Sequence, residues 1–394
     1  MAEAVYLAGA VRTPIGRFGG TLAGLSAPDL GVHAAKAALL RAGLAPEAVD
    51  AAIFGHARQA GQGPSTGRQV SVRAGVPVER PAYTVNMACG SGLKSVLLGA
   101  DAIRLGTAHV VLAGGIESMS NTPYLLPRAR WGYRLGNESV VDGMYRDGFH
   151  CLLADQLMGD TAENLVDLYK IGRAEQDEFA ARSQQRCEAA RKRGRFEAEK
   201  TAIPLEDKKK GTVLFLEDEH ARDGVTAASL AKLEPVFRKT GSVHAGNSSG
   251  ITDGGAAVVV LSEKAAARHG VKPMARLVAY AEAGVDPKVM GLGPVPAVKS
   301  LLATTGLAVK DVDLWELNEA FAAQVIACNR ELKIDEERMN VDGGAIALGH
   351  PIGATGCRIL VTLLHSLADR DLERGVATLC ISGGLGLAVL IERV

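Results

Sequence analysis

The chain has 394 residues, of which 47% are hydrophobic and 22% are charged. This composition is typical of a globular protein with a large core, and the length allows two or three packed units of roughly 100–200 residues each. Lysine plus arginine and aspartate plus glutamate both number 44, so the overall charge gives no reason to expect a nucleic acid or an anionic membrane as a partner.

The six cysteines form no CxxC pair and have no regular spacing. In a chain of this length, that pattern argues against a disulfide framework and against a zinc site. No apolar run approaches the roughly 20 residues that span a bilayer. We therefore expect a cytoplasmic protein that binds no metal and has no membrane anchor.

Short β-rich runs alternate with Ala/Leu-rich helical stretches in the first 115 residues. Strands are predicted at 5–11, 51–54, 82–85 and 109–113, and helices at 27–42 and 92–105. Ser26 precedes the first helix as an N-cap, with Pro28 and Asp29 in its first turn. Alternation of this kind predicts parallel strands joined by crossover helices, which is an α/β fold.

The middle of the chain has a different composition. Most of the charge clusters lie between 121 and 242, including 191–193 and 207–210, and amphipathic helices are predicted at 163–169 and 176–193. Such clusters are typical of a solvated face. We expect residues 121–250 to form an inserted loop domain over the α/β core, where a lid would lie.

The α/β pattern then resumes. Strands are predicted at 256–261, 275–283, 312–317, 376–380 and 387–391, and helices at 319–332 and 356–366. The run 112–116 resembles 381–385, and a strand, a glycine turn and a helix are predicted both around Cys89 and around 350–356. We predict two similar α/β halves: residues 1–120 plus 251–272, and residues 273–394.

Cys89 lies between a predicted strand and a helix that is expected to start at Leu93, with Gly90 and Gly92 beside it. A cysteine at a helix N-terminus faces unpaired N–H groups and the positive end of the helix dipole, which favour the nucleophilic thiolate. The glycines would also let a substrate approach the sulfur. A buried structural cysteine beside a tight turn is the alternative.

His350 and Cys380 are the other two chemically suggestive residues. His350 lies in the glycine-rich loop 343–356, and a neutral imidazole can activate a thiol or stabilise an oxyanion. Cys380 ends a predicted strand before Ser382, in a turn whose N–H groups can meet an anion. A structural role remains open for both. Two thiols and one imidazole at glycine-bounded turns indicate acyl transfer between thioesters.

Three further features are ambiguous. Asn318, at a strand-to-helix junction, is either an N-cap or a group that holds a water or a histidine in a site. The glycine-rich run 244–255 is either a surface turn or a source of donors for the amides of pantetheine. The loop 343–356 lacks the Lys-Ser/Thr pair of a P-loop, which argues against binding of a nucleotide phosphate. The remaining cysteines are predicted to fill the core: Cys151, Cys187, Cys328 and Cys357.

Four motifs, at 86–92, 318–321, 349–353 and 380–384, resemble those of thiolases and occur in the same order. The chain is similar to acetyl-CoA C-acetyltransferases and 3-ketoacyl-CoA thiolases over essentially its whole length. The resemblance implies a five-layered αβαβα fold. It also implies Claisen condensation of two acetyl-CoA molecules to acetoacetyl-CoA plus CoA, or thiolysis of a 3-ketoacyl-CoA.

The resemblance implies a role for each candidate. Cys89 would be the nucleophile that carries the acyl group, His350 the base that accepts its proton, and Cys380 the acid and base at the substrate carbon. Asn318 would hold a water that, with His350, forms one oxyanion hole. The backbone N–H groups of Cys89 and Ser382 would form the other.

The resemblance also implies that coenzyme A is a substrate and not a permanently bound cofactor. Segment 121–250 would cover it, with Ser249 at the pantetheine and Arg222 near the adenine nucleotide. Four residues match positions that line the acyl and pantetheine pocket: Met158, Phe237, Met290 and Phe321.

Two positions depart from the family pattern. Leu157 stands where short-chain biosynthetic members commonly have a histidine, so both acetoacetyl-CoA and a longer 3-ketoacyl chain remain open. Ser382 stands where glycine is common, but its backbone N–H is retained. Residues 123–140, which include Trp131, resemble the loop that joins dimers into tetramers, so we expect a homodimer or a homotetramer.

Three other functions are less consistent with these residues. A decarboxylating 3-ketoacyl synthase normally has histidines, or histidine and asparagine, where this chain has Cys380. A non-catalytic acyl-CoA-binding or scaffold protein on the same fold would be expected to lack Cys89 or His350. A cysteine hydrolase built from Cys89, His350 and Asn318 gives Cys380 no role. The presence of all these residues favours a thiolase.

Overall fold

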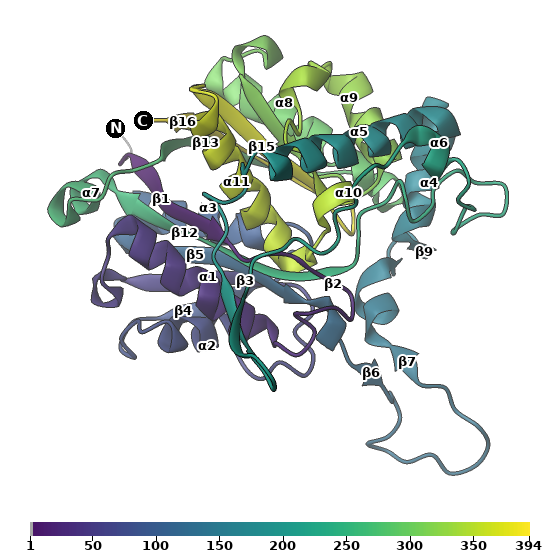
Figure 1. Ribbon diagram of the computed structural model, residues 1–394, viewed down its shortest axis with the longest axis horizontal. Coiled ribbons are helices and arrows are strands. Elements are labelled where there is room, and N and C mark those ends of the chain that lie inside the picture. Colours follow the sequence, from purple (N-terminus) through teal and green to yellow (C-terminus); the bar gives the residue numbers. More distant parts are fainter. Residues whose placement is uncertain (1–2) are drawn as a thin grey trace.

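The computed structural model describes residues 3–394, so residues 1 and 2 of the predicted N-terminal half lie outside the described part. Its main element is a mixed sheet with the strand order β14-β15-β16-β13-β1-β12-β5-β3-β4 (Figure 1). In that order the strands span Leu314–Leu317, Arg374–Ile381, Leu385–Arg393, Ala275–Gly284, Val5–Arg12, Thr252–Ser262, Val110–Ser118, Ala51–His56 and Ala82–Val85. A short β2 (Gly16–Arg17) pairs with β12.

The two halves of this sheet have the same topology. In the N-terminal half, β3 and β5 are parallel, and β5, β12 and β1 follow as antiparallel neighbours. In the C-terminal half, β14 and β15 are parallel, and β15, β16 and β13 follow in the same way. The antiparallel pair β1 and β13 joins the halves. The predicted similarity of the two halves is therefore confirmed.

The prediction of a parallel sheet was wrong for its centre. Among the described strands, only the pairs β3–β4, β3–β5 and β14–β15 are parallel. Between β15 and β16, Gly383 and Gly384 both have positive φ, at 90° and 88°, and form a tight turn. A turn this short can join only antiparallel strands. The predicted echo of 112–116 in 381–385 also fails, because the first run lies inside β5 and the second spans the end of β15 and this turn.

Helices cover and separate the two halves of the sheet. Figure 1 shows α1 (Ala27–Ala42) and α2 (Thr66–Arg73) at the opposite end of the molecule from α8 (Pro294–Thr305) and α9 (Ala322–Leu332). Between the half-sheets lie α3 (Ser91–Arg104) and α11 (Ile352–Asp369), whose buried residues share one cluster with both halves. A short α7 (Glu263–His269) joins the cluster under α1. Over the described residues this gives the layers αβαβα.

Strand β12 has no polar side chain from Gly254 to Leu261, and both of its faces are buried. Val258 and Val260 pack toward the central helices, whereas Ala257 and Val259 pack toward α1. Successive side chains of a strand point to opposite faces, so a strand between two helical layers must be apolar on both. The whole strand is buried.

Residues between β5 and β12 form an insertion, because these two strands are neighbours in the sheet. It contains α4 (Met158–Tyr169), α5 (Arg173–Lys192), α6 (Ala227–Leu230) and a π-helical turn (Tyr145–Phe149). Three small strand pairs lie in it: β6 (Tyr124–Leu125) with β7 (Val141–Asp142), β8 (His150–Cys151) with β9 (Gln156–Leu157), and β10 (Ile203–Asp207) with β11 (Gly211–Phe215). In Figure 1 the loop between β6 and β7 projects away from the body of the molecule.

The local signal at Ser26 located the start of α1 correctly. The Ser26 hydroxyl accepts from the backbone N–H of Asp29, whose carboxylate accepts from the N–H of Ser26, as expected for a capping box. Short helical turns occur at Ala345–Leu348 (α10), Pro46–Ala48, Met119–Asn121, Pro287–Leu292, Val309–Asp311 and Glu336–Arg338. No helix among residues 3–394 has the length and hydropathy needed to cross a bilayer.

Candidate active site

Cys89 lies in a tight turn between β4 and α3. The Ser91 hydroxyl accepts from the N–H of Met87 and donates to the carbonyl of Ala88, and Asn86 Oδ1 accepts from the N–H of Ala88. Ala88 has a φ of 44°, in the left-handed region that residues with a Cβ rarely adopt. These contacts hold the strained turn that carries Cys89.

The glycines of this region serve helix packing and not substrate approach, which corrects the sequence prediction. A Cβ at Gly92 would lie 2.8 Å from the carbonyl oxygen of Gly353 and 2.9 Å from the N atom of Cys357. A Cβ at Gly356 of α11 would overlap the N atom of Leu93 in α3. Helices α3 and α11 can therefore cross at backbone contact, and this crossing brings the Cys89 turn beside the His350 loop.

His350 lies between α10 and α11 with its ring directed at Cys89. Its Nε2 is 3.3 Å from Cys89 Sγ, and its Nδ1 is 2.6 Å from Thr355 Oγ1. The Thr355 hydroxyl donates to the carbonyl of Pro351, at 2.9 Å, so it can only accept from His350. The proton of the neutral ring is therefore on Nδ1, and Nε2 is free to accept the proton of Cys89.

Both partners of this pair are neutral. Burial, with smaller contributions from the cations Arg358 and Arg58, lowers the pKa of His350 to about 3. Burial also raises the pKa of Cys89, against the opposing effects of the Ser382 N–H, Arg58 and the N–H of Cys89 itself. Contrary to the expectation from the helix N-terminus, the resting thiol keeps its proton until a base removes it.

Cys380 is the last residue but one of β15, and only 1% of it is exposed. Burial raises the pKa of its thiol well above the ordinary value, and the nearby Cys89 and Cys328 sulfurs raise it further. A thiol of this kind is a proton donor at neutral pH. The N–H of Ser382, in the turn after it, opposes the rise in the pKa of the Cys89 thiol.

Asn318 is not an N-cap, because the N-cap of α9 is Phe321. Its side chain is buried, and neither Oδ1 nor Nδ2 has a hydrogen-bond partner among the described residues. An unpaired buried amide is unfavourable by roughly 1–3 kcal/mol, so this group is suited to hold a water or a ligand atom.

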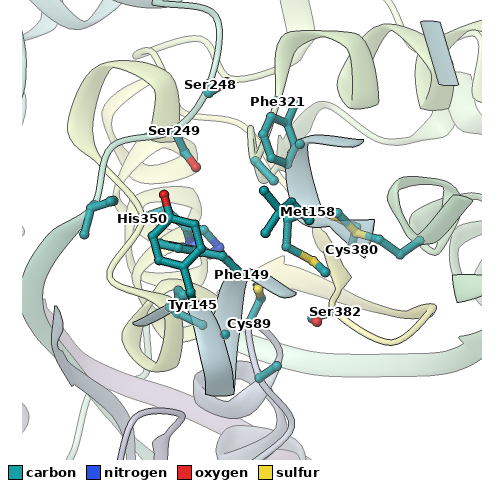
Figure 2. A pocket seen from close by; sticks show the side chains of 18 of the residues that line it. Cys89, Tyr145, Phe149, Met158, Ser248, Ser249, Phe321, His350, Cys380 and Ser382 are labelled. Atoms are coloured by element: carbon teal, nitrogen blue, oxygen red, sulfur yellow. Dashed lines mark hydrogen bonds between the residues drawn. The ribbon is translucent and has the colours of Figure 1, made fainter. Parts of the chain in front are cut away.

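One cavity of about 290 Å³ brings most of the predicted site together. Nine of the eleven predicted residues line it: Cys89, His350, Cys380, Ser382, Ser249, Met158, Phe237, Met290 and Phe321. Figure 2 shows Cys89, His350 and Cys380 around its lower part, with Ser248 and Ser249 above them in the view. Phe237 and Phe321 form one wall, with their rings edge to face at 6.3 Å.

Two predicted residues lie outside this lining. Asn318 is buried and does not line the cavity. Arg222 is exposed in the loop between β11 and α6, where its backbone N–H donates to Gln184. Among residues 3–394, no group of three or more His, Cys, Asp or Glu side chains is arranged to hold a metal ion.

The residues that line the cavity and that the sequence did not indicate include Arg58, Tyr145 and Phe149. Arg58 follows β3, and a polar residue just after the carboxyl end of a buried strand is a common mark of a site in α/β sheets. Tyr145 and Phe149 lie in the π-helical turn, which no pattern in the sequence indicated. Glu319, expected in the first turn of a helix, is instead buried and accepts from Ser183, Asn340 and the N–H of Ile346.

Comparisons with known proteins agree with this geometry. The family model of the thiolase N-terminal domain matches residues 5–264, and that of the thiolase C-terminal domain matches residues 271–393. The chain is 49% identical to the acetyl-CoA acetyltransferase of Cupriavidus necator, over 99% of both chains. It is 50% identical to that of Escherichia coli K12, over 98% of both.

Two solved structures are also similar over the whole chain. The acetyl-CoA acetyltransferase of Bacillus anthracis has a TM-score of 0.97 and 44% identity, covering 100% of this chain and 99% of that one. The human mitochondrial 3-ketoacyl-CoA thiolase in complex with CoA has a TM-score of 0.95 and 43% identity, with the same coverage. The chain therefore belongs to the thiolase family and is an acyltransferase that uses coenzyme A thioesters.

Proposed function

We propose that this thiolase transfers acyl groups through a covalent thioester on Cys89, with His350 as its base and Cys380 as the acid and base at carbon. The observation that carries this assignment is the 3.3 Å contact between His350 Nε2 and Cys89 Sγ in a cavity that Cys380 also lines. Relatives named acetyl-CoA acetyltransferase and 3-ketoacyl-CoA thiolase support acetyl-CoA and 3-ketoacyl-CoA as substrates.

In thiolysis, His350 Nε2 accepts the proton of Cys89 as the sulfur attacks C3 of a 3-ketoacyl-CoA. The negative charge that forms on the C3 oxygen is stabilised by the backbone N–H groups of Cys89 and Ser382. Both N–H groups oppose the rise in the pKa of the Cys89 thiol, which supports their lying close to the carbon that the sulfur attacks.

The bond between C2 and C3 then breaks, and its electron pair goes to C2 of the departing acetyl-CoA. Cys380 gives its proton to this carbon, while the enolate oxygen is held by the protonated His350 and by a water on Asn318. The Cys380 thiolate next takes the proton of an incoming CoA thiol, whose sulfur displaces the shortened acyl group from Cys89. Condensation is the reverse sequence.

The pantetheine arm of the substrate would extend from Cys89 toward Ser249. Figure 2 supports this direction, because Ser248 and Ser249 lie at the far end of the same cavity. In this proposal residues 121–250 cover coenzyme A between the N-terminal half (1–120 and 251–272) and the C-terminal half (273–394). Arg222, exposed within the insertion, would meet the adenine nucleotide.

The projecting loop supports the proposal of a homotetramer. Its large apolar side chains are exposed, with 83% of Trp131, 97% of Leu135 and 66% of Tyr124 accessible. Exposed apolar residues grouped in this way are typical of surfaces that associate.

All six cysteines are free, which supports the proposed location in the reducing cytoplasm.

Two variants test the catalytic assignment. Cys89→Ala should abolish covalent labelling by radioactive acetyl-CoA, because no other thiol is paired with His350. Cys380→Ser should retain the label and lose most of the condensation activity, because a hydroxyl is a far weaker acid. Stoichiometric label on Cys89→Ala would reject the nucleophile. An equal loss of both half-reactions in Cys380→Ser would reject the role at carbon.

A panel of 3-ketoacyl-CoA chain lengths tests the substrate. Leu157 lines the cavity at the position where short-chain members commonly have a histidine. An apolar side chain there supports a substrate longer than acetoacetyl-CoA. A maximum of kcat/KM at four carbons would contradict this preference.

A further inference from the structure

Arg58 is a buried cation in the catalytic cavity whose guanidinium forms no ion pair with any residue among 3–394. Only 6% of it is exposed, it lines the cavity with Cys89 and His350, and its Nε is buried without a hydrogen-bond partner among the described residues. No carboxylate in the described part of the chain lies within ion-pair distance of its guanidinium.

Three other buried arginines each lie close to a carboxylate. Arg12 contacts Glu199 at 2.6 Å and Asp218 at 2.7 Å. Arg195 contacts Glu199 at 3.3 Å and Asp342 at 3.1 Å. Even Arg358, whose nitrogens form no hydrogen bond, faces Glu316 at 3.6 Å. Burial of an unpaired cation is strongly unfavourable, so an unmatched Arg58 requires a reason.

Glu117, the carboxylate that binds the backbone N–H of Arg58, is already occupied by other groups. The Arg58 N–H itself, and those of Ala57 and Gly353, donate to Glu117, which also contacts His56 Nε2 at 3.1 Å. Asp147 lines the same cavity, but it is exposed at the rim and is not within ion-pair distance of Arg58.

The cavity wall is shaped around the guanidinium. A Cβ at Gly148 would overlap Nη2, Cζ and Nε of Arg58, although Gly148 has no positive φ that would itself require glycine. A larger residue at this position would therefore displace the end of the Arg58 side chain from its place in the cavity wall. Ala57, the neighbour of Arg58, accepts from Asn86 in the Cys89 turn and packs in one cluster with Phe149 and Cys89.

We propose that Arg58 determines substrate specificity by pairing with a carboxylate at the far end of the acyl chain. The substrate class would be 3-oxoacyl-CoA thioesters of dicarboxylic acids. This inference rests on the proposed function of Cys89. The guanidinium fork matches a carboxylate in two parallel hydrogen bonds. Apolar residues beside it, including Tyr145, Phe149 and Ile352, can hold the methylene groups between the thioester and the carboxylate.

The reaction then runs as for a neutral chain. Cys89 Sγ bonds to C3, the C2–C3 bond breaks, and acetyl-CoA leaves with its proton from Cys380. The acyl group that remains on Cys89 keeps its terminal carboxylate paired with Arg58. The thiol of coenzyme A then displaces this acyl group from Cys89. The product is a mono-CoA thioester of a dicarboxylic acid that is two carbons shorter, and no oxidant or further reactant is needed.

The test compares matched substrates in the full-length enzyme. Thiolysis is measured with 3-oxoacyl-CoA thioesters of four to ten carbons, each with a methyl or a carboxylate terminus. We expect the wild type to prefer the carboxylate form at one length, and Arg58→Leu to lower the ratio of the two kcat/KM values by about 100-fold. Arg58→Lys, which keeps the charge but not the fork, should lower it by about 10-fold.

Arg146→Leu is the matched control, because Arg146 is exposed on the same π-helical turn and does not line the cavity. It removes the same charge from the neighbourhood, and we expect the ratio to change by less than about 3-fold since exposed charges act weakly. The rate of Cys89 alkylation in each variant measures any separate effect of Arg58 on the thiol.

Each outcome decides the proposal. A wild type that prefers the methyl form at every length overturns it, even if the Arg58 variants do not fold. An unchanged ratio in Arg58→Leu overturns it as well, as does a ratio that falls equally in Arg146→Leu. Absence of acetyl label on wild-type Cys89 and of thiolysis with every substrate would instead overturn the proposed function.

Discussion

Two glycine-rich turns of this chain carry a buried histidine, and only one of them is suited to catalysis. His244 Nε2 contacts Asp177 Oδ1 at 2.7 Å, and its Nδ1 accepts from the N–H of Gly246 at 3.0 Å. His350 has a hydroxyl on Nδ1 and a thiol on Nε2. The two rings are therefore opposite tautomers.

The difference lies in which nitrogen remains available. In His244 both nitrogens bind groups of the protein, so the ring fixes the turn 244–250 against α5. In His350 only Nδ1 is bound by a structural group, and Nε2 meets the nucleophile. The turns touch, because the N–H of His350 donates to the carbonyl of Gly250 at 2.9 Å. The structural turn thus supports the catalytic one.

Replacement of His350 should have the largest effect. His350→Asn keeps a polar side chain but removes the base, so acylation of Cys89 should fall by about 1000-fold, within the range for a lost general base. Rapid-quench measurement of the acetyl-enzyme checks this. A fall of less than 10-fold would show that Cys89 is activated without His350.

The tautomer is tested by Thr355, which acts as a positioning residue through His350. Thr355→Val preserves the shape but leaves Nδ1–H without an acceptor, which should slow acylation by about 10-fold. Thr355→Ser restores the hydroxyl and should restore most of the rate, whereas a purely structural role would not be rescued in this way. Equal rates in wild type and Thr355→Val would contradict the assigned tautomer.

The sequence predicted the residues of the site better than the strand order and the tertiary contacts that position them. Motifs around Cys89, His350 and Cys380 identified residues that the cavity does unite, because each motif is a local strand-to-turn or loop signal. The order of the strands in the sheet could not be predicted in the same way. Strand β12 pairs antiparallel with β5 only because the whole insertion between them returns the chain to that position. The sequence indicated that the two halves are similar. Their shared strand order and directions became visible only from the pairing of the strands in the structure.

Tertiary contacts also decided the ambiguous residues. Asn318 is a possible N-cap from its position alone, and only the extended backbone through Phe321 excludes that role. His244 and His350 have similar glycine-rich neighbours, and Asp177 and Thr355 distinguish them. Asp177 is 67 residues away from His244, at a contact that no local pattern could indicate.

Replacement of His244 should affect stability and not the rate. His244→Leu leaves Asp177 with one neighbour fewer, although Arg173 and Asn247 still bind it. Loss of a buried hydrogen bond of this kind should lower the free energy of unfolding by roughly 1–3 kcal/mol. Acylation of Cys89 should change by less than about 3-fold, the size of an indirect effect. Denaturant unfolding and rapid quench separate the two, and a loss of rate equal to that of His350→Asn would break the comparison.

Acidification from pH 7 to pH 5 should have the smallest effect on acylation. Because burial lowers the pKa of His350 to about 3, its neutral form persists throughout this range, whereas an ordinary imidazole gains a proton near pH 6.5. The same shift makes folding less favourable as the pH falls below about 6.5, because the unfolded chain binds a proton that the folded one does not. Acylation is therefore measured where circular dichroism shows the fold intact. A rate that falls 10-fold with a midpoint near pH 6.5 would place the proton on Nε2 and leave Cys89 without its base.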